Sequence, residues 1–328
     1  MKPTLLVMVI TCILGFIIGW IYKGVWDENK QLYDYITENQ IIKHPYKPPS
    51  SPPPTVIPKK LFQTWHTKKI PPKMREAVDS IQKCNPELEY FLFDEAECIA
   101  FIKQYFSDDV LYAYNKLLPG AYKADLWRYC VMYIHGGVYL DIKYQCVDGF
   151  KFVDIMDREH FVLERPYFWK PNTHGIYNAL IIAKPSNPIF FKCIQQIVRN
   201  AQTNYYGFNE LYPTGPGLLG ELYFGNINEN GNKFRDVKLF FNVWSHGLKT
   251  HTDQHVARCM ESDALGHHIT YLDINDLSQN EDIIIYGNQI ILRSYPEYRN
   301  EQKHHQVSRH YTELWYEHGI YNPEKNNV

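Results

Sequence analysis

Three charged side chains in the middle of the chain have the types and the spacing to hold a charged, hydroxyl-rich ligand. Asp125 and Arg128 are three residues apart, and Asp141 follows after twelve intervening residues. The planar guanidinium of Arg128 matches the geometry of a diphosphate or of sugar hydroxyls. Asp125 could accept hydrogen bonds from sugar hydroxyls, and Asp141 could hold a divalent cation.

The stretch 121–144 also contains the elements that would position these side chains. Its first half predicts a helix, because apolar residues recur at helical spacing, namely Trp127, Cys130, Val131 and Ile134. Gly136-Gly137 should end this helix, and 138–140 has the composition of a buried strand. Asp141 then lies at the carboxyl end of that strand, where ligands bind in open α/β sheets.

A simpler interpretation is that Asp125 and Arg128 form only an ion pair on the helix surface, off the apolar stripe. The second carboxylate, the Gly-Gly break and the strand-end position of Asp141 together favour a functional cluster.

This pattern of residues resembles the signature of glycosyltransferase family 32. The shared elements are Asp-x-x-Arg, twelve further residues, and a Gly-Gly-Val-Tyr-x-Asp segment over 136–141. The family includes fungal α-1,6-mannosyltransferases, capsular-polysaccharide enzymes and, more distantly, glucosylating bacterial toxins. The resemblance implies an α/β fold of the GT-A type, with a Rossmann-like domain that binds a nucleotide-sugar donor and usually Mn²⁺ or Mg²⁺.

Matched residue by residue, the resemblance implies that Asp125 and Arg128 contact the sugar and the ribose of the donor. It places Tyr139 in the motif beside the donor and Asp141 on the first Asp of Asp-x-Asp, the metal ligand. The chain departs from the family at Lys143, where a second metal-binding Asp is usual. A protonated lysine cannot ligate a cation.

Three consequences of Lys143 remain open. Asp141 could hold the metal with other oxygens, such as that of Asp148. The Lys143 ammonium could itself neutralise the diphosphate, or catalysis could be lost and only binding retained. The rest of the signature is intact, which favours an active enzyme.

The N-terminus predicts a membrane anchor followed by a stem. Residues 3–22 carry no charge, and about twenty apolar residues as a helix match the roughly 30 Å hydrocarbon thickness of a bilayer. A cleaved signal peptide is the alternative, but the apolar run is long and no small-x-small site precedes Lys23. The proline-rich segment 43–58 predicts an extended spacer. We therefore expect an anchor at 1–24, a stem at 25–56 and a catalytic domain at 57–328.

The first part of the catalytic domain alternates predicted strands and helices. Strands are expected at 61–65 and 90–93, and helices at 74–84 and after the N-cap Asp94. Such alternation favours a mostly parallel, doubly wound sheet. By the resemblance, Trp65 at the end of the first strand would stack on the nucleotide base, although a core tryptophan is an equal interpretation.

Later segments supply further candidates. Strands at 161–164 and 180–183 flank an aromatic and polar loop, a candidate sugar wall or an ordinary surface loop, and Asn187-Pro188 should start a helix to Arg199. Residues Thr214, Gly215 and Pro216 open another helix, as a similar loop does beside the donor sugar in the family. Strands at 283–286 and 290–292 should form a hairpin. The resemblance assigns His310 and Trp315 to a segment that closes over the diphosphate.

Composition limits the classes of partner. The 328 residues carry 34 Lys and Arg against 36 Asp and Glu, so there is no basic excess for nucleic acid. The seven cysteines show no C-x-x-C pair, so disulfides cannot be assigned from the sequence. The chain also lacks an Asn-x-Ser/Thr sequon.

These observations predict a single-pass membrane enzyme of type II, with a lumenal catalytic domain in a Golgi- or ER-like compartment. It would transfer a hexose of mannose or glucose type from a nucleotide sugar to a glycan or glycoprotein, with retention of configuration. The alternative is a catalytically silent, membrane-tethered protein that binds a nucleotide sugar or carbohydrate.

Overall fold

The computed structural model describes residues 57–164, 175–229, 260–262, 267–271, 282–286 and 289–323. The predicted anchor at 1–24 and stem at 25–56 lie outside these residues, as does most of the aromatic loop, over 165–174. Within the described part of the chain, no helix has both the length and the apolar character needed to cross a bilayer.

A seven-stranded sheet forms the centre of the domain. Its order is β2-β1-β3-β6-β5-β8-β7. The strands span Lys60–Thr64 (β1), Glu89–Phe93 (β2), Gly137–Leu140 (β3), Glu159–Leu163 (β5), Ile176–Ala183 (β6), Met260–Ser262 (β7) and His267–Tyr271 (β8).

The direction of the strands corrects the prediction of a mostly parallel sheet. β1 is parallel to both β2 and β3, and β5 is parallel to β8. β6, however, runs antiparallel to β3 and β5, and β7 runs antiparallel to β8. The chain between β3 and β6 carries further strands rather than a crossover helix, and parallel pairing needs such a crossover. The described sheet is therefore mixed.

A second sheet of three strands has the order β4-β10-β9. β4 spans Tyr144–Cys146, β9 Ile283–Tyr286 and β10 Gln289–Ser294. β9 and β10 are antiparallel, which confirms the predicted hairpin, although its turn at 287–288 lies outside the described residues.

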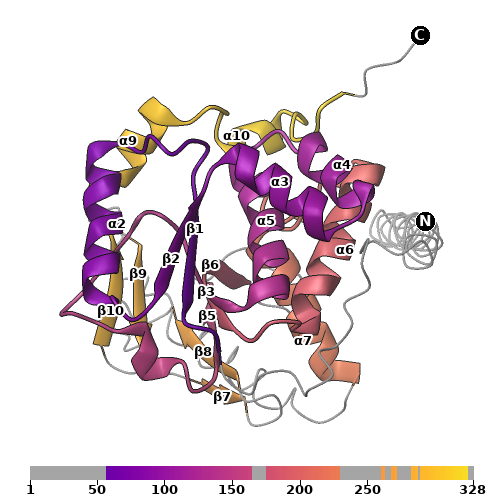
Figure 1. Ribbon diagram of the computed structural model, residues 1–328. Coiled ribbons are helices and arrows are strands. Elements are labelled where there is room, and N and C mark those ends of the chain that lie inside the picture. The colour runs from indigo at the N-terminus through magenta and orange to yellow at the C-terminus, as the bar shows by residue number, and fades with distance from the viewer. Residues whose placement is uncertain are drawn as a thin grey trace, which may run out of the picture. The chain divides into compact units, whose positions relative to one another are not determined.

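Helices lie on both sides of the large sheet (Figure 1). They span Pro72–Cys84 (α2), Glu95–Tyr105 (α3), Asp108–Lys116 (α4), Gly120–His135 (α5), Pro188–Thr203 (α6), Pro216–Glu229 (α7), Tyr298–His305 (α9) and Tyr311–Tyr316 (α10), with a short 3-10 helix at Phe152–Ile155 (η1). α5 packs against α6, and α2 packs against β4 on the other side.

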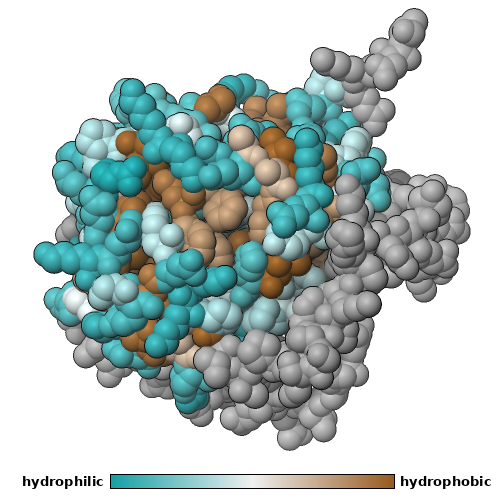
Figure 2. Space-filling view, viewed as in Figure 1, coloured by the Kyte–Doolittle hydropathy of each residue, from teal (hydrophilic) through white to brown (hydrophobic). Residues whose placement is uncertain are grey.

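The alternation of side chains along the strands creates two separate cores. Leu61 and Val138 belong to a cluster with Ile81 of α2, whereas Phe62 stacks on His135 of α5. Successive side chains of a strand point to opposite faces, so neighbouring residues of β1 serve different cores. Figure 2 shows that hydrophobic side chains gather at the centre of the viewed face, where β1 and β2 lie in Figure 1, inside a border of hydrophilic residues.

Local capping signals explain where several helices begin. The Asp94 side chain accepts from the Glu97 backbone, and the Glu97 side chain accepts from the Asp94 backbone, which forms the capping box of α3. Asn187 caps α6 ahead of Pro188. Gly136 ends α5 with a φ of 59°, and a Cβ there would lie 2.5 Å from the Pro185 nitrogen. These predicted helix boundaries are confirmed, whereas α4 was not predicted.

Candidate functional site

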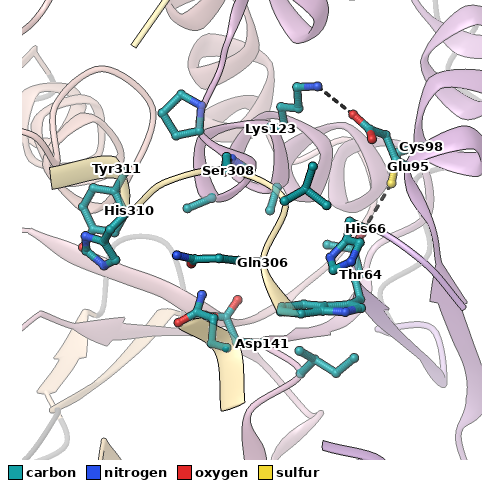
Figure 3. Close-up of a pocket in the computed structure, with 18 of the residues that line it drawn as sticks. Thr64, His66, Glu95, Cys98, Lys123, Asp141, Gln306, Ser308, His310 and Tyr311 are labelled. Carbon is teal, nitrogen blue, oxygen red and sulfur yellow. Dashed lines mark hydrogen bonds and ion pairs between the residues drawn. The ribbon is translucent and has the colours of Figure 1, made fainter. Parts of the chain in front are cut away.

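A cavity of about 220 Å³ lies at the carboxyl ends of β1 and β3. Its wall is formed by the residues after β1 (64–66), the start of α5, the end of β3 (139–142) and the C-terminal segment 306–311. Figure 3 shows Asp141 and Gln306 near the middle of the cavity, with His310 and Tyr311 on one side and His66 on the other. The position agrees with the rule that open α/β sheets bind ligands beyond the carboxyl ends of their strands.

Arg128 lines this wall and is the centre of a buried network. Its side chain is only 5% exposed. The Nη2 nitrogen lies 3.1 Å from Asp125 Oδ1 and 3.5 Å from Asp141 Oδ1, and Nη1 donates to the Asn178 carbonyl at 2.6 Å. The guanidinium carbon lies 4.5 Å from the centre of the Tyr139 ring, in cation–π contact. Arg128 therefore joins both predicted carboxylates in one arrangement.

Asp125 lies deeper than the sequence suggested. It is 7% exposed, so the alternative interpretation, an ion pair on the helix surface, is wrong: nearly every side of α5 from 125 to 132 is buried. Oδ1 accepts from Asn178 Nδ2 at 2.9 Å, and Oδ2 accepts from Thr214 Oγ1 at 2.7 Å. Burial raises the pKa of Asp125, while Arg128 and these two hydrogen bonds oppose that rise.

Asp141 is the carboxylate that reaches the cavity. Its side chain is 25% exposed, and Oδ1 accepts from the Tyr139 hydroxyl at 2.9 Å. The same oxygen lies beside Arg128, so Tyr139 and Arg128 together fix the orientation of the carboxylate. Asp141 is thereby presented to a ligand by a rigid support.

Lys143 does not line the cavity. Its ammonium forms an ion pair with Asp282, which directly precedes β9, and donates to the Tyr177 hydroxyl at 2.7 Å. It lies 5.3 to 5.6 Å from the ring centres of three tyrosines, Tyr144, Tyr177 and Tyr298. Lys143 therefore links the end of β3 to the β9–β10 hairpin.

The donor set around Asp141 does not fit a cation site of the Asp-x-Asp type. One oxygen of Asp141 is already shared with Arg128, and the second position of the motif carries an ammonium that repels cations. Among the described residues, no three His, Cys, Asp or Glu side chains are grouped so that they could hold a metal ion. The metal-binding role of Asp141 stays a prediction, and no step proposed below depends on it.

Two histidines and a tryptophan line opposite parts of the cavity. Trp65 and His66 follow β1, with ring centres 4.8 Å apart, and His310 comes from the C-terminal segment. Burial lowers the pKa of His66, as does His305, while Glu95 opposes the change. Burial and Arg299 likewise lower the pKa of His310, while Glu313 and Glu210 oppose. Both imidazoles are therefore neutral near pH 7.

The other predicted residues lie outside the cavity wall. Thr214 and Gly215 contact Asp125, where a Cβ on Gly215 would lie 3.1 Å from Oδ2, and Pro216 begins α7. The Trp315 indole donates to the Tyr206 carbonyl at 2.6 Å. Of the predicted residues, the cavity wall brings together Trp65, Arg128, Tyr139, Asp141 and His310.

Sequence reasoning missed several members of the site. Asn178 bridges Asp125 and the Tyr129 hydroxyl at 2.9 Å each, and Asp282 pairs with Lys143. Lys123 pairs with Glu95 at 2.6 Å at the cavity wall. Asn178 lies on β6 and Asp282 directly precedes β9. The pairing of these strands depends on segments distant in the sequence, so no local motif marks either residue. Lys123, by contrast, lies two residues before Asp125 within the stretch 121–144, so its position in the sequence was a signal.

Comparison with known proteins identifies the region that carries this network. Residues 71–162 match the family described as "Glycosyltransferase sugar-binding region containing DXD motif". The chain is 29% identical over 199 residues to inositol phosphoceramide mannosyltransferase 3 of Schizosaccharomyces pombe, which covers 57% of this chain and 49% of that protein. It is 24% identical over 241 residues to the initiation-specific alpha-1,6-mannosyltransferase of Candida albicans, covering 61% of this chain and 62% of that one.

The chain thus spans less than two thirds of the length of each of these relatives. Among solved structures, PaToxG Glycosyltransferase aligns with 66% of this chain and 83% of its own, with a TM-score of 0.42 and 18% identity.

Proposed function

Because the chain belongs to glycosyltransferase family 32, whose sugar-binding region contains a DXD motif, we propose that it transfers a mannose-type hexose from a nucleotide sugar to a glycan acceptor. One observation carries this proposal: Arg128, Tyr139 and Asp141 form a buried network that opens into a cavity at the carboxyl ends of β1 and β3.

In the proposed complex the nucleotide sugar occupies this cavity. Trp65 stacks on the base, and Asp141, held by Tyr139 and Arg128, accepts hydrogen bonds from donor hydroxyls. Asp125 keeps the Arg128 guanidinium in place from behind the wall. His310, on the C-terminal segment, faces the diphosphate.

The reaction is the displacement of a nucleoside diphosphate from the anomeric carbon by an acceptor hydroxyl. The chain contributes by positioning the donor and by stabilising the charge that develops on the departing diphosphate. Cationic side chains of the wall are Arg128, Lys123 and Arg309. Retention of the anomeric configuration and a GT-A arrangement are part of the proposal, and they rest on the family.

The acceptor and the cellular location belong to the same proposal. The curated relatives are named for mannosyl transfer to inositol phosphoceramide or for α-1,6-mannosyl transfer. We infer a glycan, glycoprotein or inositol-phosphate lipid acceptor. The apolar segment 3–22 would anchor the enzyme, with the catalytic domain on the lumenal side.

A donor screen with the full-length chain tests the function. GDP-mannose, UDP-glucose, UDP-galactose and UDP-GlcNAc are each incubated with Mn²⁺ or with EDTA, and release of the nucleoside diphosphate is measured. We expect turnover of GDP-mannose that Asp141→Asn abolishes. The matched control is Asp157→Asn, because Asp157 is an exposed carboxylate paired with Arg158 away from the cavity. If no donor binds to the folded protein, the proposal is wrong.

A silent donor-binding protein is the second candidate, favoured by the lysine at the second motif position. It predicts that GDP-mannose binds and that Asp141→Asn weakens binding. It also predicts no release or transfer of the sugar with any acceptor tested, including mannosides and inositol-phosphate lipids.

A further inference from the structure

Two cysteines meet where α2 ends and the three-stranded sheet begins. Cys84 is the last residue of α2, and Cys146 is the last residue of β4. The two cysteines are free in this structure and their thiols lie close enough to interact, although 61 residues lie between them in the sequence. Both are half-buried, so small reagents can reach them.

Asn85 holds the backbone on both sides of this thiol pair. Its side-chain amide donates to the Ile81 carbonyl at 3.1 Å and to the Cys146 sulfur at 3.4 Å, and its oxygen accepts from the Phe152 backbone at 2.7 Å. Asn85 is 2% exposed. The end of α2, where Cys84 lies, and the segment around Cys146 are thus fixed to one another.

The other cysteines of the described region have different surroundings. Cys98, Cys130 and Cys193 are buried, and burial raises the pKa of each of their thiols. What sets these three thiols apart from Cys84 and Cys146 is that they are fully buried, so a reagent reaches them less readily in the folded protein.

We propose that Cys84 and Cys146 form a disulfide when the chain folds in the presence of a disulfide oxidant such as oxidised glutathione. One thiolate attacks glutathione disulfide, breaks its S–S bond and releases one glutathione thiolate. The second cysteine then attacks the mixed disulfide and releases the other. Two cysteine thiols are oxidised, one glutathione disulfide is reduced, and the two protons go to the released glutathiones or to water.

The bridge forms during folding rather than afterwards. Burial and the neighbouring Cys84 raise the pKa of Cys146 to about 12, so little thiolate is present in the folded, reduced chain. Once formed, the bridge joins α2 to β4, the strand that follows Asp141 and Lys143. Such a bond persists in an oxidising compartment and is rare in the cytosol, so its presence in the native protein would report on the compartment.

The test uses the full-length chain refolded in oxidised and reduced glutathione, and in dithiothreitol as the reduced reference. Each sample is acid-quenched, unfolded and alkylated with N-ethylmaleimide. The chain has seven cysteines, so we expect seven N-ethylmaleimide adducts in the reduced sample and two fewer in the oxidised sample. Trypsin should then yield a linked pair of peptides, 84–103 and 144–151. A second digestion after Glu87 separates Cys84 from Cys98.

Variants connect the bridge to stability. Oxidation should raise the thermal midpoint of the wild-type chain by about 5 °C, and the shift should vanish in Cys84→Ser and in Cys146→Ser. Cys193→Ala is the matched control and should keep both the shift and the loss of two adducts. The proposal is overturned by seven adducts in the oxidised sample, or by a link that involves Cys12 or Cys259. Peptide mapping of the wild type shows whether Cys84 and Cys146 are linked, even if a variant fails to fold.

Discussion

Replacing Asp125 by Asn tests whether the buried network holds the site together. In the wild type, the Asp125 carboxylate forms an ion pair with Arg128 at 3.1 Å and accepts hydrogen bonds from Asn178 and Thr214 at 2.9 and 2.7 Å. The carboxamide of the variant would keep one oxygen for Asn178 and Arg128, and its nitrogen could donate to the Thr214 hydroxyl. The shape survives, but the contact with Arg128 and both hydrogen bonds lose the charge of the carboxylate.

The magnitude follows from this difference. A hydrogen bond to a charged group is worth about 1.5–3 kcal/mol and a neutral one about 0.5–1.5 kcal/mol, so three such changes amount to roughly 3 kcal/mol. The burial that raises the pKa of Asp125 also penalises its carboxylate, which offsets part of this loss. Arg128 keeps Asp141 as a partner at 3.5 Å. We expect Asp125→Asn to lower the free energy of unfolding by about 2 kcal/mol.

Asp125→Ala should cost more, about 3–5 kcal/mol. It leaves the buried Arg128 guanidinium without its nearer carboxylate and Thr214 without its acceptor, and the Asn178 amide keeps only the Tyr129 hydroxyl. Urea denaturation of the full-length chain at pH 7 measures both values. Asp157→Asn, at an exposed carboxylate, should stay within about 0.5 kcal/mol of the wild type.

The refuting result is an Asp125→Asn variant as stable as the Asp157→Asn control. It would mean that the contacts of the Asp125 carboxylate make no net contribution to the free energy of unfolding. GDP binding, measured by calorimetry on folded Asp125→Asn, adds a second readout. If Asp125 only supports Arg128, affinity should fall modestly through misplacement of Asp141. If the Asp125–Arg128 pair has no part in holding the ligand, the affinity for GDP should not change.

Three further predictions concern the surroundings of the cavity. Lys143→Met should lower the free energy of unfolding in urea by about 2–3 kcal/mol, because Asp282 loses its ammonium partner, and Lys143→Asp should lower it further because two carboxylates would then face each other. Because the pKa of His310 lies below the usual 6.5, the unfolded chain takes up a proton there before the folded chain does, so stability should fall as the pH drops below about 6.5. Thermal unfolding between about pH 5 and pH 7 should show a smaller fall in His310→Asn; an unchanged slope would contradict this. Trp65→Leu should weaken GDP binding by about tenfold and Trp65→Phe by less, as calorimetry can show, since stacking on a base is worth roughly 1–3 kcal/mol.

Local signals explain most of what the sequence predicted correctly. The Asp94 capping box, the Asn187-Pro188 start and the Gly136 stop each act through a few neighbouring residues, so their effects can be read without the fold. The end of β3, and with it the position of Asp141, follows from the same kind of signal. The family match then covers 71–162, the part that contains this segment.

Features that depend on distant segments were not predictable in this way. The antiparallel direction of β6 depends on how the chain returns after β5. Asn178 reaches Asp125 only because β6 pairs with β3 in one particular register, with Leu140 opposite Leu180. The helical periodicity of α5 indicated one apolar stripe, but α6 packs against this helix as well, and it is buried nearly all round. The apparent surface pair became a buried one for that reason.

Lys143 shows how a distant partner changes the meaning of a motif residue. From the sequence, its ammonium was a candidate for neutralising the donor diphosphate. An ammonium has three donors, and in the structure two of them go to Asp282 and Tyr177, with tyrosine rings around it. To reach a diphosphate in the cavity it would have to leave Asp282, whose carboxylate also lies 3.8 Å from Arg299 and accepts from the Tyr177 hydroxyl at 3.4 Å. The two roles therefore make opposite predictions for Lys143→Met. A structural pair predicts a loss of stability with GDP affinity nearly unchanged, whereas a diphosphate ligand predicts a loss of affinity that exceeds the loss of stability.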